Sequence, residues 1–229
     1  EPREGGRVAV VCVCNAAKLN ILGAATMRML TAALGRLAGE PGLRAGVLRG
    51  EGEREFIGGA DINEMAVLDA ARARDFITTL HEVCAAIRGL PVPVVARMQG
   101  YALGAGLEVA AACDLRVAGA GARMGMPEVR VGIPSVIEAA LLPMLIGWGR
   151  TRRLLLVGGN ARSEQPTGYD TDPHPPKVTD TLLTVIGTPI DGVSFQLIDS
   201  LDGLMANLTG GTTFQGQAVV PIDCDYITD

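Results

Sequence analysis

The sequence predicts an α/β fold, and three observations lead to this prediction. Short runs rich in β-branched residues alternate with longer segments whose apolar residues recur at helical spacing. Apolar residues make up 48% of the chain and aromatic residues only 3%, so the core must be built from small aliphatic side chains. The chain also has 30 glycines, many of them between predicted elements, where they permit tight turns and close backbone approach.

The predicted elements follow one another in a regular order through the first two thirds of the chain. Strands are predicted at 7–15, 44–50, 92–100 and 114–119. Helices are predicted at 23–39, 69–90, 105–113 and in two pieces within 136–159 that meet around 147–149. Alternation of strands with helices is typical of an α/β architecture.

The bulk properties exclude several classes of function. A net charge of −5 gives no general attraction to nucleic acid or to an anionic membrane. No signal-peptide pattern and no apolar run long enough to span a bilayer occurs, so no membrane association is expected. The five scattered cysteines favour a reducing compartment, so a cytoplasmic location is expected. Cys12 and Cys14 share a predicted strand face, and core packing is favoured over a metal pair because no second Cys/His pair accompanies them. No zinc or calcium spacing is present, and the isolated His81 is assigned as a surface or core residue.

The composition changes near Gly159 and divides the chain into two predicted regions, 1–163 and 164–229. The first region has 19 Lys and Arg against 15 Asp and Glu, whereas the second has one basic residue and ten acidic ones. A linker rich in Pro, Gly and Asp at 164–177 precedes short β-like runs. The second region is therefore predicted to be acidic and β-rich.

One carboxylate stands in the segment QGYALGAGLEVAAACDLRVAG, which is otherwise made almost wholly of small and apolar residues. Glu108 lies one turn into a helix that begins near Ala105, directly after a glycine turn. The first N–H groups of a helix lack intrahelical partners and favour negative charge, so this turn is a candidate oxyanion hole. The alternative is a glycine-rich packing turn with Glu108 facing water. This segment alone does not favour either interpretation.

Two further segments add candidate groups. The turn FIGGADINEM (56–65) follows a buried strand and offers a second backbone N–H group, although an ordinary loop is the commoner explanation for such a turn. Glu128 lies in a predicted loop rich in Gly, Pro and Met, where most glutamates are simply solvated. A second carboxylate near an apolar site can divide acid and base roles with the first. Dinucleotide, P-loop and GxSxG motifs are absent.

Taken together, these segments resemble the crotonase superfamily, the enoyl-CoA hydratase/isomerase family. The matching stretches are AAKLNILGAATMRML, FIGGADINEM, VPVVARMQGYALGAGLEVAAACDLRVA and MGMPEVRVGIPSVIEAALLPMLIGWGRTRRLLL, which cover most of residues 7–158 in the family's order. The resemblance implies a spiral of repeated ββα units, usually assembled as a homotrimer or a dimer of trimers. It also implies an acyl-CoA ligand and no separate cofactor, because coenzyme A is part of the substrate.

The resemblance assigns roles to individual residues. It implies that the N–H groups of Ala60 and Ala105 form the oxyanion hole. Glu108 and Glu128 match the two catalytic glutamates of the hydratases, which add water across the C2–C3 double bond of a trans-2-enoyl-CoA in fatty acid metabolism. The resemblance also implies substrate-binding positions at Lys18, Leu19, Gly59, Asp61, Ile62, Gly104 and Ser135; no metal is implied.

Alternatives remain open at this point. The same fold also supports enoyl-CoA isomerases and hydratase-lyases, and a non-catalytic acyl-CoA-binding or scaffold protein is a third possibility. Residues 164–229 depart from the family's pattern, in which C-terminal helices cover the acyl site. A natural fusion, a frameshift, a chimera and misassigned residues would each explain this departure.

Overall fold

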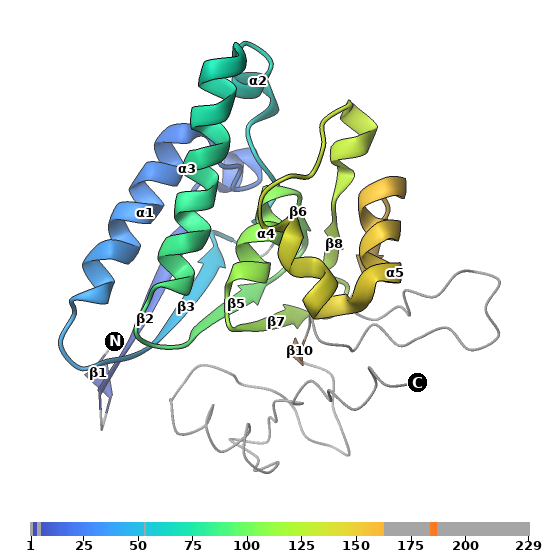
Figure 1. The fold of residues 1–229 in the computed structure, drawn as a ribbon. Helices are drawn as coiled ribbons and strands as arrows, with labels where there is room; N and C mark the ends of the chain where they lie inside the picture. The colour runs from blue at the N-terminus through green and yellow to red at the C-terminus, as the bar shows by residue number, and fades with distance from the viewer. Residues whose placement is uncertain (1, 4–5, 53, 163–183, 187–229) are drawn as a thin grey trace, which may run out of the picture.

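The computed structural model describes residues 2–3, 6–52, 54–162 and 184–186, and two β-sheets form its framework (Figure 1). The larger sheet has the strand order β1-β2-β3-β5-β7-β10 and the smaller sheet the order β4-β6-β8-β9. The strands of the larger sheet are β1 (Pro2–Arg3), β2 (Gly6–Val13), β3 (Leu43–Gly50), β5 (Val94–Met98), β7 (Leu115–Gly119) and β10 (Thr184–Ile186). Those of the smaller sheet are β4 (Glu55–Ile57), β6 (Tyr101–Leu103), β8 (Arg123–Gly125) and β9 (Asn160–Arg162).

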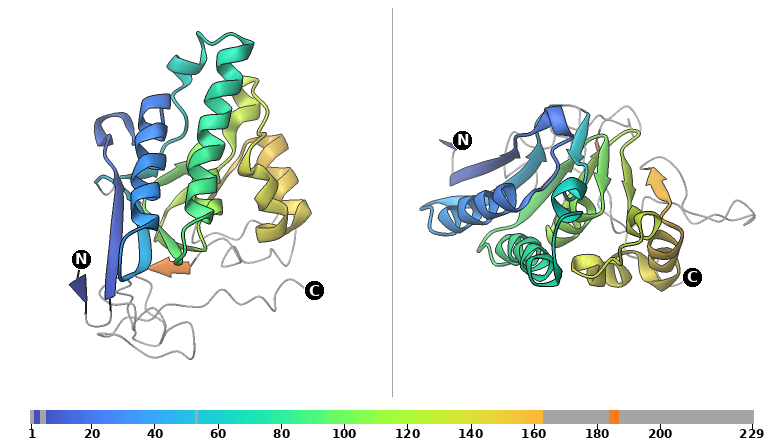
Figure 2. Two further views of the ribbon diagram at one scale, coloured as in Figure 1. Left: turned by 60° about the vertical axis from the view of Figure 1, so that its left-hand side comes forward. Right: turned by 90° about the horizontal axis from the view of Figure 1, so that it is seen from above.

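Five α-helices and three short 3-10 helices complete the described part of the chain. The α-helices are α1 (Ala24–Ala38), α2 (Ile62–Met65), α3 (Ala70–Arg88), α4 (Ala105–Ala112) and α5 (Leu142–Val157). The 3-10 helices are η1 (Ala16–Lys18), η2 (Pro127–Val131) and η3 (Glu138–Leu141). Helices α1 and α3 lie side by side on one face of the larger sheet (Figures 1 and 2). Their buried faces carry the aliphatic residues that the helical spacing predicts, including Met27, Leu30 and Leu34 on α1.

A strand–strand–helix unit repeats along the chain. Strands β3, β5 and β7 enter the larger sheet and pair in parallel, and each is followed by a strand of the smaller sheet, β4, β6 or β8, which also pair in parallel. Helical segments follow each strand pair: α2 and α3 after β4, α4 after β6, and η2 after β8. The ends of β4, β6 and β8 therefore lie next to one another, and the chain leaves each of them toward the same region.

Most predicted elements of the described region are present, and the differences have simple causes. β4, β6, β8 and β9 were not predicted because each has only three residues, too few for an alternating pattern. The predicted break within 136–159 occurs in α5 at Gly147, whose φ of 75° is left-handed, and the segment before α5 contains η3. Cys14 lies beyond the end of β2 and is exposed, so its predicted core packing is wrong.

The predicted second region falls almost wholly outside the described residues. Its boundary at 163/164 lies there, as do the linker and most of the predicted β-like runs. The exception is β10, part of one such run, which pairs in parallel with β7 at the edge of the larger sheet.

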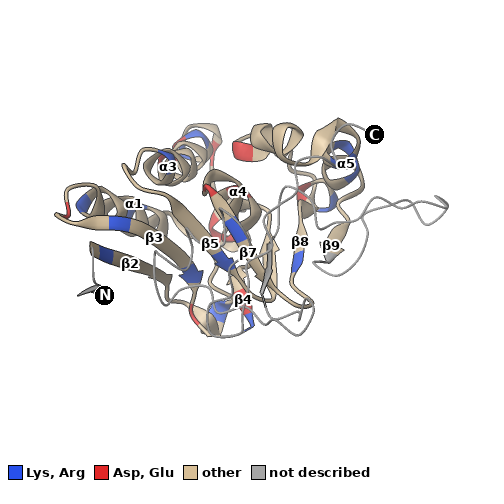
Figure 3. Ribbon diagram, turned by 90° about the horizontal axis from the view of Figure 1, so that it is seen from below, with Lys and Arg blue, Asp and Glu red and all other residues tan. Residues whose placement is uncertain are grey.

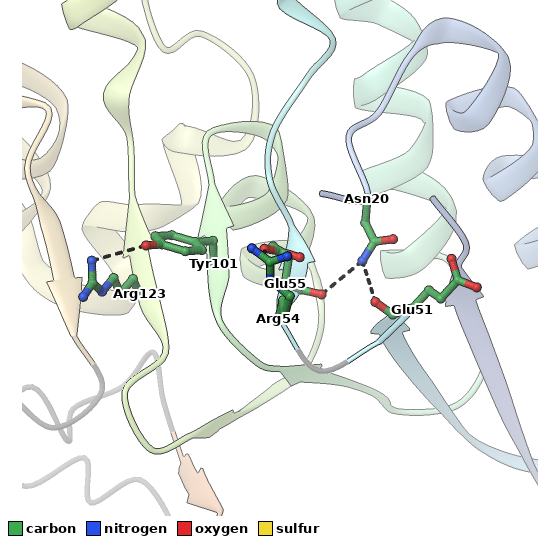
Figure 4. Close-up of polar contacts among 6 residues, drawn as sticks. All are labelled: Asn20, Glu51, Arg54, Glu55, Tyr101 and Arg123. Atoms are coloured by element: carbon green, nitrogen blue, oxygen red, sulfur yellow. Dashed lines mark hydrogen bonds and ion pairs between the residues drawn. The ribbon is translucent and has the colours of Figure 1, made fainter. Parts of the chain in front are cut away.

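A buried asparagine holds the first loop against the start of the smaller sheet. Asn20 is fully buried, and its Nδ2 donates to the carbonyl oxygens of Glu51 (3.0 Å) and Glu55 (3.1 Å) (Figure 4). Its Oδ1 accepts from the Asn15 N–H at 3.0 Å. Asparagine suits this position because its short amide tolerates the left-handed φ of 53°. These hydrogen bonds hold the chain at the start of β4, whose C-terminal end leads into the turn after Ile57.

Charged residues of both signs are distributed over the helices and strands (Figure 3). Across the smaller sheet, the Arg123 guanidinium on β8 donates to the Tyr101 hydroxyl on β6 at 3.3 Å (Figure 4). A search of the described helices found none with the length and apolar character that a bilayer crossing requires. Within the same residues, no three His, Cys, Asp or Glu side chains are grouped as a metal site would need.

Candidate active site

Helix α4 is the element on which the candidate site is built, and a glycine turn sets its position. Gly104 precedes the helix with φ 51° and ψ −120°, a conformation that a side chain would strain. A Cβ atom on Gly106 would overlap the Ile57 carbonyl oxygen, so glycine there lets the helix backbone approach β4. The small residues GAG at 104–106 thus bring the first turn of α4 against the end of β4.

A cavity of about 310 Å³ opens beside this helix turn. Its wall is almost entirely aliphatic or aromatic, and it draws on α2, α3, the turn after β4, the start of α4, and the segment 127–137. The two carboxyl groups in its wall are those of Glu108 and Glu128. The strands β7 and β8 separate these two glutamates in the sequence, yet both line the same cavity.

Glu108 is buried, with 4% of its surface exposed, and its Oε1 accepts a hydrogen bond from the Ala139 N–H at 3.0 Å. Burial raises the pKa of Glu108 from 4.5 to about 7, because a charged carboxylate loses its hydration in the apolar cavity. The Ala139 hydrogen bond opposes this rise, and the nearby Glu128 carboxyl adds to it. The interpretation in which Glu108 faces water is therefore wrong.

Glu128 lies in the first turn of η2, where the sequence predicted a loop. The Ser135 hydroxyl donates to its Oε2 at 3.2 Å, which orients the carboxyl group. Burial raises the pKa of Glu128, and the Ser135 hydrogen bond acts against that rise. A Cβ atom on Gly104 would overlap Glu128 Oε1, so this carboxyl rests directly against the turn that begins α4.

The backbone N–H groups of Ala60 and Ala105 both lie at the cavity, and neither has an acceptor among the described residues. On one side of Ala60, the Gly59 carbonyl accepts from the Leu22 N–H at 2.8 Å; on the other, the Asp61 N–H donates to the Leu22 carbonyl at 2.9 Å. These two hydrogen bonds hold the turn at residues 59–61 against Leu22, and the Ala60 N–H lies between them. The Ala105 N–H is the first of α4 and has no intrahelical partner.

The cavity contains most of the residues that the resemblance assigned, and leaves three outside its wall. Those in the wall are Glu108, Glu128, Ala60, Ala105, Gly59, Gly104, Ile62 and Ser135. Those outside it are Lys18, Leu19 and Asp61. Asp61 caps α2, its Oδ1 accepting from the Asn63 and Glu64 N–H groups at 3.0 and 3.2 Å. The carbonyl of Leu19 accepts from the Gly58 N–H at 2.9 Å, so the loop of Lys18 and Leu19 borders the cavity turn without entering the wall.

Sequence reasoning missed two kinds of site residue. The apolar wall includes Phe76 and Leu80 of α3, whose helical spacing marked them as buried but gave no sign that they border a cavity. Ala139 acts through its backbone N–H, and no side-chain pattern reports such a donor.

The far end of α4 is held by a buried arginine. Arg116 on β7 is 4% exposed, and its Nη1 donates to the carbonyls of Ala110 (3.2 Å) and Cys113 (2.6 Å). Nη2 donates to the Asp114 carbonyl at 3.1 Å. A cation at a helix C-terminus satisfies the last carbonyls and complements the helix dipole. Both ends of α4 are thus fixed, which keeps Glu108 and the Ala105 N–H in place.

Comparison with known proteins identifies the family. The enoyl-CoA hydratase/isomerase family profile matches residues 3–166. A short-chain-enoyl-CoA hydratase of Clostridium acetobutylicum is 34% identical over 161 residues, which are 70% of this chain and 62% of that protein. A crotonyl-CoA hydratase of Syntrophomonas wolfei is 34% identical over 150 residues, 65% of this chain and 58% of that protein. The chain thus spans less than two thirds of the length of these relatives.

Solved structures agree with this result. An enoyl-CoA hydratase from Bacillus anthracis matches with 30% identity and a TM-score of 0.66, covering 68% of this chain and 61% of that one. An enoyl-CoA hydratase from Thermoplasma volcanium matches with 30% identity and a TM-score of 0.66, covering 71% and 64%. On the strength of the fold, the cavity and these matches, the chain belongs to the enoyl-CoA hydratase/isomerase family.

Proposed function

We propose that this protein adds water across the C2–C3 double bond of a trans-2-enoyl-CoA, with Glu108 and Glu128 as the catalytic residues. The observation that carries the proposal is the meeting of two carboxyl groups and two free N–H groups in one apolar cavity. The two curated relatives described above are named as hydratases, which supports the same reaction class.

The oxyanion hole of the proposal consists of the Ala60 and Ala105 N–H groups, which receive the thioester oxygen. As water attacks C3, electron density moves through C2 to this oxygen, and the resulting enolate-like charge is stabilised by donors already in place. Such a donor lowers the barrier by about 3–4 kcal/mol in other enzymes. The apolar walls strengthen this effect, because charges interact more strongly where water is excluded.

The two carboxyl groups divide the proton transfers. Glu108, as carboxylate, holds the water and takes one proton as the oxygen–C3 bond forms. Glu128, as carboxylic acid, shares that water and delivers a proton to C2, so that a hydroxyl group and a hydrogen are added to the substrate. The pair holds one proton throughout, on Glu128 before the step and on Glu108 after it, and this proton returns to Glu128 before the next turnover. Like charges in one apolar cavity disfavour double ionisation, which supports a state with one proton on the pair.

The test is the loss of enoyl-thioester absorbance when the pure protein is incubated with crotonyl-CoA. Glu128→Gln removes the proton donor while keeping its shape, and the rate of hydration should fall by about 10²–10⁴-fold. Glu82→Gln, an exposed change on α3, is the matched control and should keep the parent rate. No decay with crotonyl-CoA or longer enoyl-CoAs refutes the hydratase; an isomerase that uses Glu108 alone would survive Glu128→Gln.

We further propose that the chain assembles as a homotrimer or a dimer of trimers, as the resemblance implies. Light scattering coupled to size-exclusion chromatography measures the mass directly, and a monomeric mass would contradict this proposal.

A further inference from the structure

The 3-10 helix η3 carries the backbone donor that holds Glu108, and a second carboxylate anchors that helix. Glu138 directly precedes Ala139, whose N–H donates to Glu108 Oε1. Glu138 is itself buried, with 5% of its surface exposed. It takes no place in the cavity wall, and the proposed reaction does not use it.

The partner of Glu138 comes from α3. The Nδ1 of His81 lies 2.8 Å from Glu138 Oε1, and the His81 side chain is 62% exposed. The tautomer with the proton on Nδ1 makes this contact a hydrogen bond from His81 to the Glu138 carboxyl group. A buried carboxylate without a partner is costly, so the contact ties η3 to α3. The exposed imidazole is thus linked to Glu108 through two intervening residues, Glu138 and Ala139.

We infer that His81 and Glu138 are positioning residues for Glu108: the pair fixes η3 so that the Ala139 N–H stays on the Glu108 carboxyl group. The inference rests on the proposed function in that Glu108 acts as the base. Neither His81 nor Glu138 lies in the cavity wall, so they act through the Glu108 carboxyl group that they hold in place.

The charges around Glu108 give this pair a measurable signature. Two carboxyl groups act on the Glu108 pKa, Glu128 from η2 and Glu138 from η3, and both raise it. On α3, burial raises the pKa of the Cys84 thiol, and the charges of Glu138 and Glu108 raise it further, so the three groups lie near one another. The Arg88 guanidinium acts on the same pKa in the opposite direction. Glu138 therefore has two opposed effects on Glu108: its charge raises the pKa, while the Ala139 donor that it anchors lowers it.

Two substitutions separate these effects. Glu138→Gln removes the charge but keeps an oxygen that accepts from His81, so η3 stays anchored and Glu108 titrates at lower pH. His81→Ala removes the donor and keeps the Glu138 carboxyl group, so the Ala139 contact weakens and Glu108 titrates at higher pH. Disruption of packing alone would move the midpoint in the same direction for both variants. His81 is exposed, so its truncation leaves no internal cavity.

The titration midpoint of Glu108 is measured in two ways on the full chain. The first is the pH dependence of the free energy of unfolding, taken as the difference between each variant with and without Glu108→Gln. The second is the acid limb of kcat/KM for crotonyl-CoA hydration. Arg72→Ala is the matched control, since it removes the cation of an exposed pair with Asp69 (2.9 Å) on the same helix. Its midpoint should equal that of the parent protein.

Opposite shifts for Glu138→Gln and His81→Ala, with none for Arg72→Ala, support the inference. Shifts of the same sign, or no shift in either variant, overturn it. The unfolding measurement needs no turnover, so it gives this answer even if crotonyl-CoA is not hydrated; absence of turnover would overturn the proposed function alone.

Discussion

Replacing Glu108 by glutamine should stabilise the protein at alkaline pH and leave its stability unchanged at acidic pH. The glutamine amide keeps the size of the protonated side chain and an oxygen that accepts from the Ala139 N–H. It carries no charge at any pH. The variant therefore isolates the cost of ionising Glu108 inside the apolar cavity.

The magnitude follows from the raised pKa. The rise from 4.5 to about 7, at ~1.4 kcal/mol per pH unit, corresponds to about 3 kcal/mol. Below about pH 4 both the folded and the unfolded chain bind the proton, so the variant and the parent are equally stable. As the pH rises further, the unfolded chain releases this proton first, and the parent loses stability until the folded-state pKa near 7 is passed. Above that pH the difference stays constant.

Urea unfolding followed by circular dichroism, repeated between about pH 4 and about pH 8.5, measures this difference. Titrating groups remote from Glu108 contribute equally to both proteins and cancel in the subtraction. Glu82→Gln, which removes an exposed carboxylate from α3, serves as the control and should follow the parent at every pH. A difference between Glu108→Gln and the parent that stays flat from acid to alkaline pH would refute the argument that burial raises this pKa.

Three further predictions concern the ends of α4. Ala105→Pro removes one proposed oxyanion donor at a helix position where proline is tolerated. The kcat/KM for crotonyl-CoA should therefore fall by about 10²–10³-fold, while the thermal unfolding midpoint is retained. The control is Ala70→Pro, at the first position of α3 and away from the cavity, which should keep the parent rate. Gly104→Ala places a side chain at a φ of 51° and against the Glu128 carboxyl. The free energy of unfolding, measured in urea, should therefore fall by at least ~1–2 kcal/mol. An unchanged urea midpoint would contradict the strain assigned to this turn. Arg116→Leu leaves the carbonyls at the end of α4 without donors, which should cost about 2–3 kcal/mol in the same assay; an equally stable variant would show that water replaces the guanidinium.

The sequence predicted helices and strands correctly where their hydrophobic pattern extends over many residues. The helices over 24–38 and 70–88 and the strands over 6–13 and 43–50 have enough residues for their periodicity to be unambiguous. The strands β4, β6 and β8 were missed because three residues in a glycine-rich turn carry no period. These short strands nevertheless bring the turns of Gly59, Gly104 and Glu128 together.

The sequence by itself determined the fold class, the family resemblance and the two candidate glutamates with their glycine turns, because glycine turns and isolated carboxylates are visible as residue types. Only the tertiary structure decided the state of those groups. Whether Glu108 faced water or the core was open from its segment alone, and its pKa depends on walls contributed by α2, α3 and 127–137. The same holds for the Ala139 donor and for the pairing of His81 with Glu138, 57 residues apart. Desolvation and backbone hydrogen bonding are properties of what surrounds a residue in space, and a linear pattern does not encode them.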